Sequence, residues 1–489
     1  MIQICVTLTE PSVVALIDRM ADLAGRADMF EIRGDYLEQL DLLTILRART
    51  EPLLFTCRSQ EQGGRWRGEE SRRRMILLEA VRRGFDYVDV EYESRFMEVV
   101  AEKTGRGLVL SHHDLEGVPE DLDELYSEMR EMGADVVKIA VTPRSMAEVG
   151  RFLAFASRTS RSGGPPLVPI AMGPLGVVSR VITGRYAAPF TFACPEPGAE
   201  GAPGQVPLDE MRDVYRAGSV SPSTRLYGVL GSDVSRSLSP RLHNAAFAAS
   251  EVDAVYVPFS SPALEPFLTA LPALEVAGFS VTRPFKQEII PHLQKLEAQA
   301  EASGSVNTVV VESGKLHGSS TDGAGVVAAL ASHAALEGAE VLILGAGGAA
   351  RAAARALIDA GARVTVMARD PARAAVVADA LGCSWGNLDH VAGCRWDVLI
   401  NATPVGSDEL SDETPVPAEL QRPGTVVLDM VYEPRETRLL REARAAGAQG
   451  VGGLEMLIAQ AARQFETWTG KPAPLEAMRA AVDASDDAG

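Results

Sequence analysis

The segment GADVVKIAVTP at residues 133–143 reads as a short buried β-strand that contains one charge, Lys138. An ammonium group in an apolar strand is unfavourable unless it is paired with an anion or loses its proton. The lysine therefore breaks the pattern of a simple core strand, and such departures often mark functional positions. The residues around Lys138 decide how it is interpreted.

Seven further β-rich segments occur between residues 1 and about 195, and helical stretches separate them. They are ICVTLT, MFEIRGD, LLFTCRS, YVDVEY, LVLSHHD, LVPIAMG and FTFAC. Eight strands that alternate with connecting segments over about 200 residues are typical of a (β/α)8 barrel near its lower size limit. A doubly wound sheet is the alternative, but it more often has fewer strands. We therefore predict an α/β chain whose N-terminal part is a TIM barrel.

Polar side chains share one face on four of these strands. Successive residues of a strand point to opposite faces, so Glu31 and Arg33 face the same way. The same alternation places the side chains of Arg58, His113 and Lys138 on the same face of the sheet, towards the C-terminal ends of their strands. Any one of them could be a surface charge or part of a core ion pair. Five together indicate an active site at the end of the barrel where such enzymes carry it.

The residue types indicate carbonyl chemistry. A lysine held among apolar neighbours and other cations favours its neutral amine, which can attack a carbonyl carbon. Lys138 would then be the nucleophile and His113 the proton carrier, while the arginines hold an anionic substrate. These residues alone do not distinguish an aldolase from a dehydratase.

The composition limits the class of protein. The chain has 489 residues, of which 46% are hydrophobic and 23% charged, so we expect a globular enzyme of about three domains. A net charge of −19 argues against a nucleic-acid partner. Five scattered cysteines without a CxxC pair predict neither a disulfide framework nor a metal site and favour a cytoplasmic location. Neither a signal peptide nor an apolar run of about 18 residues is apparent, so no membrane partner is predicted.

The second half begins after a segment rich in Pro, Gly and Ser that ends near residues 219–224. Further on, AEVLILGAGGAARAAARALIDAGARVTVMARDPARA reads as a strand, a glycine turn, a helix and a second strand. Gly345, Gly347 and Ala350 match the GxGxxA fingerprint of dinucleotide-binding Rossmann domains. Arg369 and Arg373 follow the second strand, where an NAD site would carry an acidic residue, so NADP is favoured.

Loops rich in Ser, Thr and Asn carry a second pair of charged residues, Lys286 and Asp322. Taken alone, Lys286 is more easily read as a solvated surface charge, because lysine is rarely buried. Its loop composition suits a polyol substrate, however, and the lysine could carry the proton that accompanies hydride transfer, with Asp322 orienting it.

The first half resembles type I 3-dehydroquinate dehydratase in EIRGD, FTCRSQEQGG, LSHHD, DVVKIAVTP, MGPLGVVSR and APGQ. The resemblance implies a Schiff base at Lys138, proton removal by His113, and loss of a hydroxyl group. It also implies substrate binding by Glu31, Arg33, Arg58, Arg180 and Gln205. One departure is Gln62, which occupies a position that is usually glutamate in that family.

Residues 225–485 resemble shikimate dehydrogenase in SRSLSP, VTRPFKQEI, GSVNTVV, STDGAGV, INATPVG, DMVYEP and GGLEMLIAQAARQFETWTG. The resemblance implies that Lys286 and Asp322 form the catalytic pair. The implied substrate residues are Ser237, Ser239, Thr282, Asn307, Tyr432 and Gln460. The predicted cofactor residues are Gly345, Ala346, Gly347, Gly348, Ala349, Arg369, Arg373, Thr403 and Gly453.

We therefore predict a bifunctional enzyme that dehydrates 3-dehydroquinate and then reduces the product to shikimate with NADPH. The predicted domains are a barrel at 1–218, a substrate lobe at 225–330 completed by helices at 455–485, and a Rossmann domain at 331–454. Two alternatives stay open: a quinate/shikimate dehydrogenase that uses NAD, and a catalytically silent sensor of the same ligands. The sequence leaves room for a homodimer.

Overall fold

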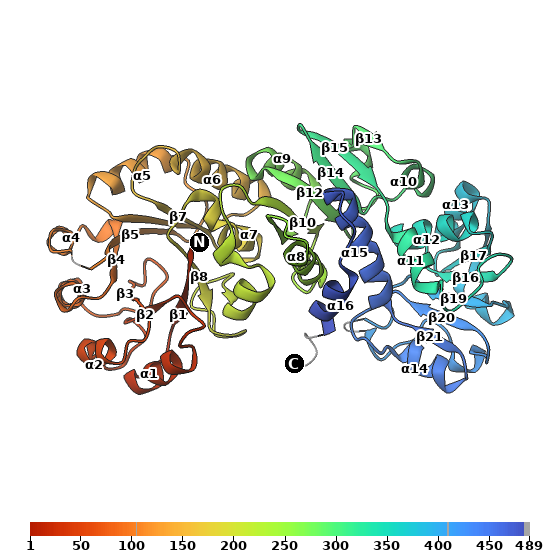
Figure 1. Cartoon of the computed structure of the whole chain (residues 1–489), viewed down its shortest axis with the longest axis horizontal. Coiled ribbons are helices and arrows are strands. Elements are labelled where there is room, and N and C mark those ends of the chain that lie inside the picture. Colours follow the sequence, from red (N-terminus) through yellow and green to blue (C-terminus); the bar gives the residue numbers. More distant parts are fainter. Residues whose placement is uncertain (104, 408–409, 484–489) are drawn as a thin grey trace. The chain divides into compact units, whose positions relative to one another are not determined.

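The computed structural model describes residues 1–103, 105–407 and 410–483 (Figure 1). The chain folds into two compact units. Unit 1 comprises residues 1–228, 232–240 and 253–276, and unit 2 comprises residues 229–231, 241–252 and 277–489. The domain boundaries predicted at residues 218, 330 and 454 stay a prediction.

The N-terminal sheet of unit 1 is entirely parallel. Its strands are β1 (Gln3–Leu8), β2 (Met29–Arg33), β3 (Leu53–Thr56), β4 (Tyr87–Glu91), β5 (Gly107–Asp114), β6 (Val136–Val141), β7 (Leu167–Ala171), β8 (Phe190–Cys194) and β9 (Val206–Pro207). The hydrogen-bonded order is β7-β6-β5-β4-β3-β2-β1-β8-β9, so the first strand lies between the second and the eighth. This order is that of a (β/α)8 barrel, and the predicted fold class is confirmed.

Helices follow the first seven strands and lie outside the ring of strands (Figure 1). They are α1 (Val13–Asp22), α2 (Leu42–Arg47), α3 (Glu70–Arg83), α4 (Met97–Ala101), α5 (Leu122–Glu131), α6 (Met146–Thr159) and α7 (Val177–Val181). Local sequence signals set several of their ends. Ser12 and Ser145 cap α1 and α6 by accepting a backbone N–H, and α3 ends at Gly84, whose φ of 87° suits glycine.

The inward face of the barrel has an apolar layer and a polar layer. The apolar layer includes Cys5, Leu54, Val109, Val136 and Phe190. Two residues further along five of the strands, the same face carries the buried polar residues Thr7, Thr56, Asp89, Ser111 and Lys138. Because side chains of equal parity point the same way, the alternation that fills the lower barrel also gathers polar groups at its C-terminal end.

A second, mixed sheet has the order β11-β10-β12-β14-β15-β13. Its strands are β10 (Arg225–Gly231), β11 (Ala254–Ser260), β12 (Val276–Val281), β13 (Lys295–Leu296), β14 (Thr308–Glu312) and β15 (Lys315–Ser319). β14 runs antiparallel to both β12 and β15. The helices of this part and of the remaining chain are α8 (Ser239–Ala249), α9 (Leu264–Leu274), α10 (Ala298–Ser303), α11 (Asp322–Leu330), α12 (Gly348–Asp359), α13 (Pro371–Leu381), α14 (Arg438–Ala445), α15 (Gly453–Thr469) and α16 (Leu475–Asp483).

The third sheet is parallel and has the order β18-β17-β16-β19-β20-β21. Its strands are β16 (Glu340–Leu344), β17 (Arg363–Ala368), β18 (Ser384–Asn387), β19 (Val398–Asn401), β20 (Val426–Asp429) and β21 (Gln449–Val451). Val341 and Ile343 pack on one face with residues of α11 and α12, while Leu342 and Leu344 pack on the other with residues of α14. Apolar side chains on both faces define the predicted doubly wound Rossmann domain.

Candidate active sites in the two halves

Lys138 lies in the polar layer of the barrel with 6% of its surface exposed. Its Nζ is 3.8 Å from Glu31 Oε1 and 3.7 Å from Asp89 Oδ2, and it sits 4.1 Å from the centre of the Phe192 ring. Burial lowers the pKa of Lys138, and although the two carboxylates raise it, the net shift is downward. A larger fraction of this amine is therefore neutral than in a solvated lysine.

Asp89 joins this site, and the sequence analysis missed it. Its carboxylate accepts hydrogen bonds from Arg58 Nη2 at 2.8 Å and from Ser111 Oγ at 2.6 Å. Burial raises the pKa of Asp89, but Arg58 and Lys138 outweigh it and hold that pKa below its usual value. Asp89 is thus a charged bridge between the predicted arginine and the predicted nucleophile. Its parity in YVDVEY, which pairs it with Val109 on the inward face of the next strand, was the signal that could have revealed it.

Glu31 and Gln205 are connected through Thr7. Gln205 Nε2 donates to Thr7 Oγ1 at 2.8 Å, and Thr7 Oγ1 donates to Glu31 Oε2 at 2.7 Å. Thr56 Oγ1 also donates to Glu31, at 2.9 Å. Arg33 lies beside this chain, where Asp35 binds its guanidinium through both carboxylate oxygens at 2.9 and 2.7 Å. These donors and acceptors surround Glu31, one of the two carboxylates beside Lys138. They suit a substrate with several hydroxyl groups.

His113 lies on β5, one strand from Lys138, and its pairing with Ala140 puts both side chains on the inward face. Burial, and then the charges of Arg58 and Lys138, lower the pKa of His113 well below its usual value. The imidazole is therefore neutral and able to accept a proton. Gln62 Oε1 accepts the backbone N–H of His113 at 2.8 Å, so this departure from the family pattern contacts the main chain of the proton carrier.

Arg180 on α7 is 2% exposed. Its Nη2 donates to the carbonyl of Pro203 at 3.0 Å, and its buried Nε has no hydrogen-bond partner among the residues that the structure describes. Burial lowers the pKa of Arg180 to about 10, which still leaves it charged at neutral pH. A buried guanidinium with free donor capacity is a ready partner for a carboxylate ligand.

In unit 2, Lys286 Nζ and Asp322 Oδ2 form a direct ion pair. The Lys286 side chain is 16% exposed and that of Asp322 is 1% exposed, so the lysine end faces open space and the carboxylate is enclosed. Asp322 is the first residue of α11, where the helix dipole favours a negative charge. The arrangement holds the amine of Lys286 against an enclosed carboxylate.

Asn307 connects this pair to two other predicted residues. Its Nδ2 lies 2.7 Å from Asp322 Oδ1 and 3.1 Å from Gln460 Oε1. Thr282 is close in the chain to Lys286, and its N–H donates to Leu230 O at 2.8 Å, which ties the loop to β10. The structure therefore brings Asn307, Gln460, Lys286 and Asp322 together. Among the described residues, no hydrogen bond joins Thr282 to them.

The remaining predicted substrate residues of this half are Ser237, Ser239 and Tyr432. Ser237 and Ser239 are adjacent at the start of α8, where the Ser239 N–H donates to Ser237 Oγ at 3.2 Å. They belong to unit 1, whereas the lysine pair belongs to unit 2. Tyr432 is half-buried in the loop that follows β20. Their roles in substrate binding stay predictions.

The glycine turn after β16 has the geometry that a dinucleotide requires. Gly345 has a φ of 114°, and a Cβ there would lie 2.9 Å from the carbonyl of Ala402. A Cβ on Gly347 would meet nothing within 4 Å, so the main chain is open to a ligand at that point. Ala346 and Ala349 are half-buried beside it. An open glycine main chain at the start of α12 fits the pyrophosphate of a dinucleotide.

Gly348 has a different role from that of the other turn residues. A Cβ there would lie 2.8 Å from Ser305 Oγ and 3.3 Å from two carbons of Lys286. Glycine at 348 thus lets the Lys286 side chain approach the glycine turn. Gly453 makes a comparable close approach, because a Cβ there would lie 2.6 Å from the carbonyl of Met430.

Thr403 is positioned by a buried network at the C-terminal edge of the third sheet. Asn401 Oδ1 accepts both the N–H and the hydroxyl of Thr403, at 3.0 and 2.7 Å. Asn401 Nδ2 in turn donates to Asp429 Oδ1 at 2.9 Å, and Thr437 Oγ1 donates to Asp429 Oδ2 at 2.7 Å. Burial raises the pKa of Asp429 to about 6. The sequence analysis selected Thr403 but neither Asn401 nor Asp429, which hold it.

Arg369 and Arg373 are exposed at the end of β17 and the start of α13, and neither forms an ion pair with a described residue. Two unpaired guanidinium groups beside the dinucleotide turn fit a 2′-phosphate.

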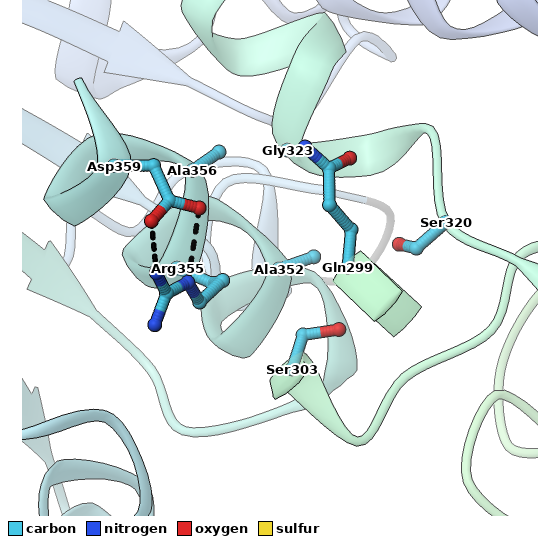
Figure 2. Close-up of a pocket in the computed structure, with 8 residues that line it drawn as sticks. All are labelled: Gln299, Ser303, Ser320, Gly323, Ala352, Arg355, Ala356 and Asp359. Carbon is cyan, nitrogen blue, oxygen red and sulfur yellow. Dashed lines mark hydrogen bonds and ion pairs between the residues drawn. The ribbon is translucent and has the colours of Figure 1, made fainter. Parts of the chain in front are cut away.

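A small cavity between α10, α11 and α12 does not belong to either site. Its volume is about 10 Å³, which is room for about one water molecule. Figure 2 shows its lining, which includes Ser303, Ser320 and Gln299. Ser320 Oγ is buried there and has no hydrogen-bond partner among the described residues, so a single water would satisfy it. The cavity is too small for a substrate.

The fold and the sites define a class of protein. A (β/α)8 barrel with a buried, carboxylate-flanked lysine is suited to carbonyl chemistry, and a Rossmann domain beside a lysine–aspartate pair is typical of a dinucleotide-dependent oxidoreductase.

Comparisons with known proteins identify both halves. The family model described as type I 3-dehydroquinase matches residues 4–222. The model for the shikimate dehydrogenase substrate binding domain matches 229–309, that for shikimate / quinate 5-dehydrogenase matches 328–430, and that for the shikimate 5′-dehydrogenase C-terminal domain matches 453–482.

One relative covers both halves. The bifunctional 3-dehydroquinate dehydratase/shikimate dehydrogenase of Arabidopsis thaliana is 35% identical over 479 residues, which are 92% of this chain and 79% of that protein. The NADP(+) shikimate dehydrogenase of Halorubrum lacusprofundi is 46% identical over 274 residues, covering 53% of this chain and 98% of that one. A crystal structure of the Thermus thermophilus shikimate 5-dehydrogenase with NADP(H) and shikimate is 36% identical, with a TM-score of 0.50, and covers 53% of this chain and 99% of that one.

The chain therefore belongs to the family of bifunctional 3-dehydroquinate dehydratases/shikimate dehydrogenases. The family predicted from the sequence is confirmed. Among the described helices, none combines the length and the apolar character that crossing a bilayer requires.

Proposed function

We propose that Lys138 and Lys286 are the two residues around which this chain's reactions take place, the first in dehydration and the second in reduction. The observation that supports the first assignment is the buried amine of Lys138, 3.7 Å from Asp89 and one strand away from a neutral His113. A neutral amine and a neutral imidazole on the same face are the two groups that imine-based elimination requires.

In the barrel, the Lys138 amine adds to the ketone carbon of 3-dehydroquinate, and loss of the carbonyl oxygen as water leaves a protonated imine. His113 then takes a proton from the adjacent carbon, and the electron pair of that C–H bond moves into the imine. The substrate hydroxyl leaves as water with the proton that His113 returns. Hydrolysis of the imine releases 3-dehydroshikimate and restores the amine.

The remaining barrel residues bind the substrate. Arg180 holds its carboxylate, because it is a buried cation that no described carboxylate pairs with. Glu31, Arg58 and Gln205 bind the hydroxyl groups and are held in place by Thr7 and Asp89. Arg33, which Asp35 holds, binds beside them.

In the second half, bound NADPH supplies a hydride to the carbonyl carbon of 3-dehydroshikimate. Lys286 delivers the proton to the oxygen of that carbonyl, and Asp322 orients the lysine and stabilises its charged form. Asn307, Gln460, Thr282 and Tyr432 contact hydroxyl groups of the ring. Ser237 and Ser239 bind its carboxylate.

The cofactor of this chain is proposed to be NADP. Gly345, Gly347, Gly348 and the alanines between and after them would hold the pyrophosphate, and Thr403 and Gly453 would lie on the nicotinamide side. Arg369 and Arg373 would bind the 2′-phosphate. The open main chain at Gly347 supports a dinucleotide, and the unpaired arginines support NADP over NAD.

Two variants separate the reactions. Lys138→Ala is expected to abolish shikimate formation from 3-dehydroquinate with NADPH, yet to leave reduction of supplied 3-dehydroshikimate intact. Lys286→Ala is expected to leave dehydration of 3-dehydroquinate intact and to abolish the reduction step, so that 3-dehydroshikimate accumulates. Borohydride added during turnover should attach a reduced substrate to Lys138, detected by peptide mass spectrometry. An adduct on another lysine, or turnover of 3-dehydroquinate by the Lys138 variant, would overturn the assignment.

We also expect a cytoplasmic location, because all five cysteines are free thiols. A homodimer is the assembly to test, and sedimentation of the purified protein at several concentrations distinguishes it from a monomer.

A further inference from the structure

Arg351 lies in the first turn of α12, directly after the glycine fingerprint, and none of the roles assigned so far includes it. Its buried Nε has no hydrogen-bond partner among the described residues. One of its terminal nitrogens, Nη1, lies 4.0 Å from the place that a Cβ on Gly304 would occupy. The side chain is therefore half-buried, and no described residue accepts a hydrogen bond from its buried Nε.

The lack of a partner is not caused by a lack of carboxylates. The chain has 66 acidic and 47 basic residues, and many of its arginines are paired. Arg355, one turn further along α12, binds both carboxylate oxygens of Asp359, as Figure 2 shows. Arg351 forms no ion pair with a described residue, although it starts from the same helix. An unpaired, partly buried guanidinium indicates that an anion outside the chain completes it.

The topology brings Arg351 close to the two arginines proposed for the cofactor. β16 and β17 are adjacent and parallel, with Leu344 opposite Met367, so α12 and α13 begin at the same edge of the sheet. These two helices contact each other. Burial lowers the pKa of Arg351, and the positive charge of Arg373 lowers it further, which shows that the two guanidinium groups lie within electrostatic reach. Like charges without a counter-ion repel, and a dianion between them would relieve that repulsion.

We propose that Arg351 is a third guanidinium that binds the 2′-phosphate of NADP, together with Arg369 and Arg373, and that it contributes to the preference for NADP over NAD. This inference rests on the proposed NADP site. A phosphate monoester carries nearly two negative charges at neutral pH and accepts paired N–H bonds from guanidinium groups.

The three arginines are not equivalent. Arg369 and Arg373 are exposed, so they lose side-chain freedom when they bind a ligand. Arg351 is half-buried, and less freedom is lost when it binds. We therefore expect Arg351 to contribute at least as much to phosphate affinity as either exposed arginine.

The test is titration calorimetry of the full chain with two nucleotides that differ only in the phosphate, adenosine 2′,5′-bisphosphate and adenosine 5′-monophosphate. Arg351→Ala should weaken the bisphosphate by about 10-fold or more and the monophosphate by less than about 3-fold. Arg355→Ala removes a positive charge from the same helix and should change neither. Arg351→Lys keeps the charge without the paired donors and should lose part of the effect.

Each outcome decides between the proposals. If Arg351→Ala binds the bisphosphate normally while Arg373→Ala does not, the role of Arg351 is refuted and the NADP site stands. Equal weakening of both nucleotides by Arg351→Ala also refutes a 2′-phosphate role. If the wild-type chain does not prefer the bisphosphate, the proposed NADP site itself fails. Should the alanine variant not fold, equal binding of the bisphosphate by Arg351→Lys and wild type refutes the inference.

Discussion

Replacing Asp89 by asparagine tests the electrostatics of the barrel site most directly. The change keeps the shape of the side chain but removes the carboxylate 3.7 Å from Lys138 Nζ. At an effective dielectric constant of about 20, two unit charges at that distance interact by roughly 4.5 kcal/mol, which corresponds to about three pKa units. Solvent entry and relaxation reduce this value. We expect the pKa of Lys138, already lowered by burial, to fall by a further one to two units or so.

The assay is the pH dependence of kcat/KM for dehydration of 3-dehydroquinate, together with the rate of borohydride trapping at low substrate concentration. Both report the neutral fraction of Lys138 in the free enzyme. The acid limb of each profile should therefore move to lower pH in Asp89→Asn, although maximal turnover falls because Arg58 loses its partner. Glu31→Gln removes a carboxylate 3.8 Å from the same nitrogen and should move the limb in the same direction.

Asp86→Asn is the matched control, because Asp86 precedes β4 at the opposite end of the strand that carries Asp89 and accepts the N–H of Leu53. It should leave the profile unchanged. An acid limb that stays in place or moves to higher pH in a folded Asp89→Asn enzyme would show that Lys138 does not depend on this carboxylate, and the description of the site would be wrong.

Three further predictions concern single residues. Gln62→Glu places a carboxylate beside His113 and should raise the pKa of the histidine. The acid limb of the kcat profile, which reports the enzyme–substrate complex, should then move to higher pH by about one unit. An acid limb that does not move argues against the contact between residue 62 and His113. Gly348→Ala forces a Cβ into contact with Lys286 and should lower shikimate dehydrogenase turnover by up to about 100-fold while dehydratase activity is unchanged. Dehydrogenase turnover equal to that of the wild type would contradict this prediction. The pKa of Asp429 is raised to about 6, so the protonated carboxyl stabilises the fold fully below pH 4 and this contribution, about 3 kcal/mol, is lost as the pH rises through 6. The stability of Asp429→Asn relative to wild type, from urea unfolding, should therefore increase between pH 4 and pH 7, and a pH-independent difference refutes the shift.

The fold could be predicted from the sequence to a large extent. All eight segments read as barrel strands are strands, and GAGG lies at the end of a strand that feeds a helix. These features are local, because alternation with a period of two and the backbone freedom of glycine are written in consecutive residues. The families followed from the same short motifs.

The site was predictable where a charged residue interrupts an apolar strand, as at Lys138. Asp89 was not predicted because YVDVEY contains two acidic residues. Only the hydrogen bonds with Ser111 and Arg58 show which of them lies beside the lysine. Arg351 was not among the predicted residues for a similar reason. In a helix with two arginines, the sequence does not reveal that Arg355 has Asp359 as a partner while Arg351 has no ion-pair partner among the described residues.

By itself, then, the sequence determined the α/β architecture, the two enzyme families, and the residue types available for imine and hydride chemistry. Only the tertiary structure decided which carboxylates stand next to Lys138, why Gly348 must lack a side chain, and which of the described arginines have no ion-pair partner. The physical reason is range: strand and helix patterns arise between neighbours in the chain, whereas Coulomb energies and steric contacts depend on distances between segments far apart in sequence.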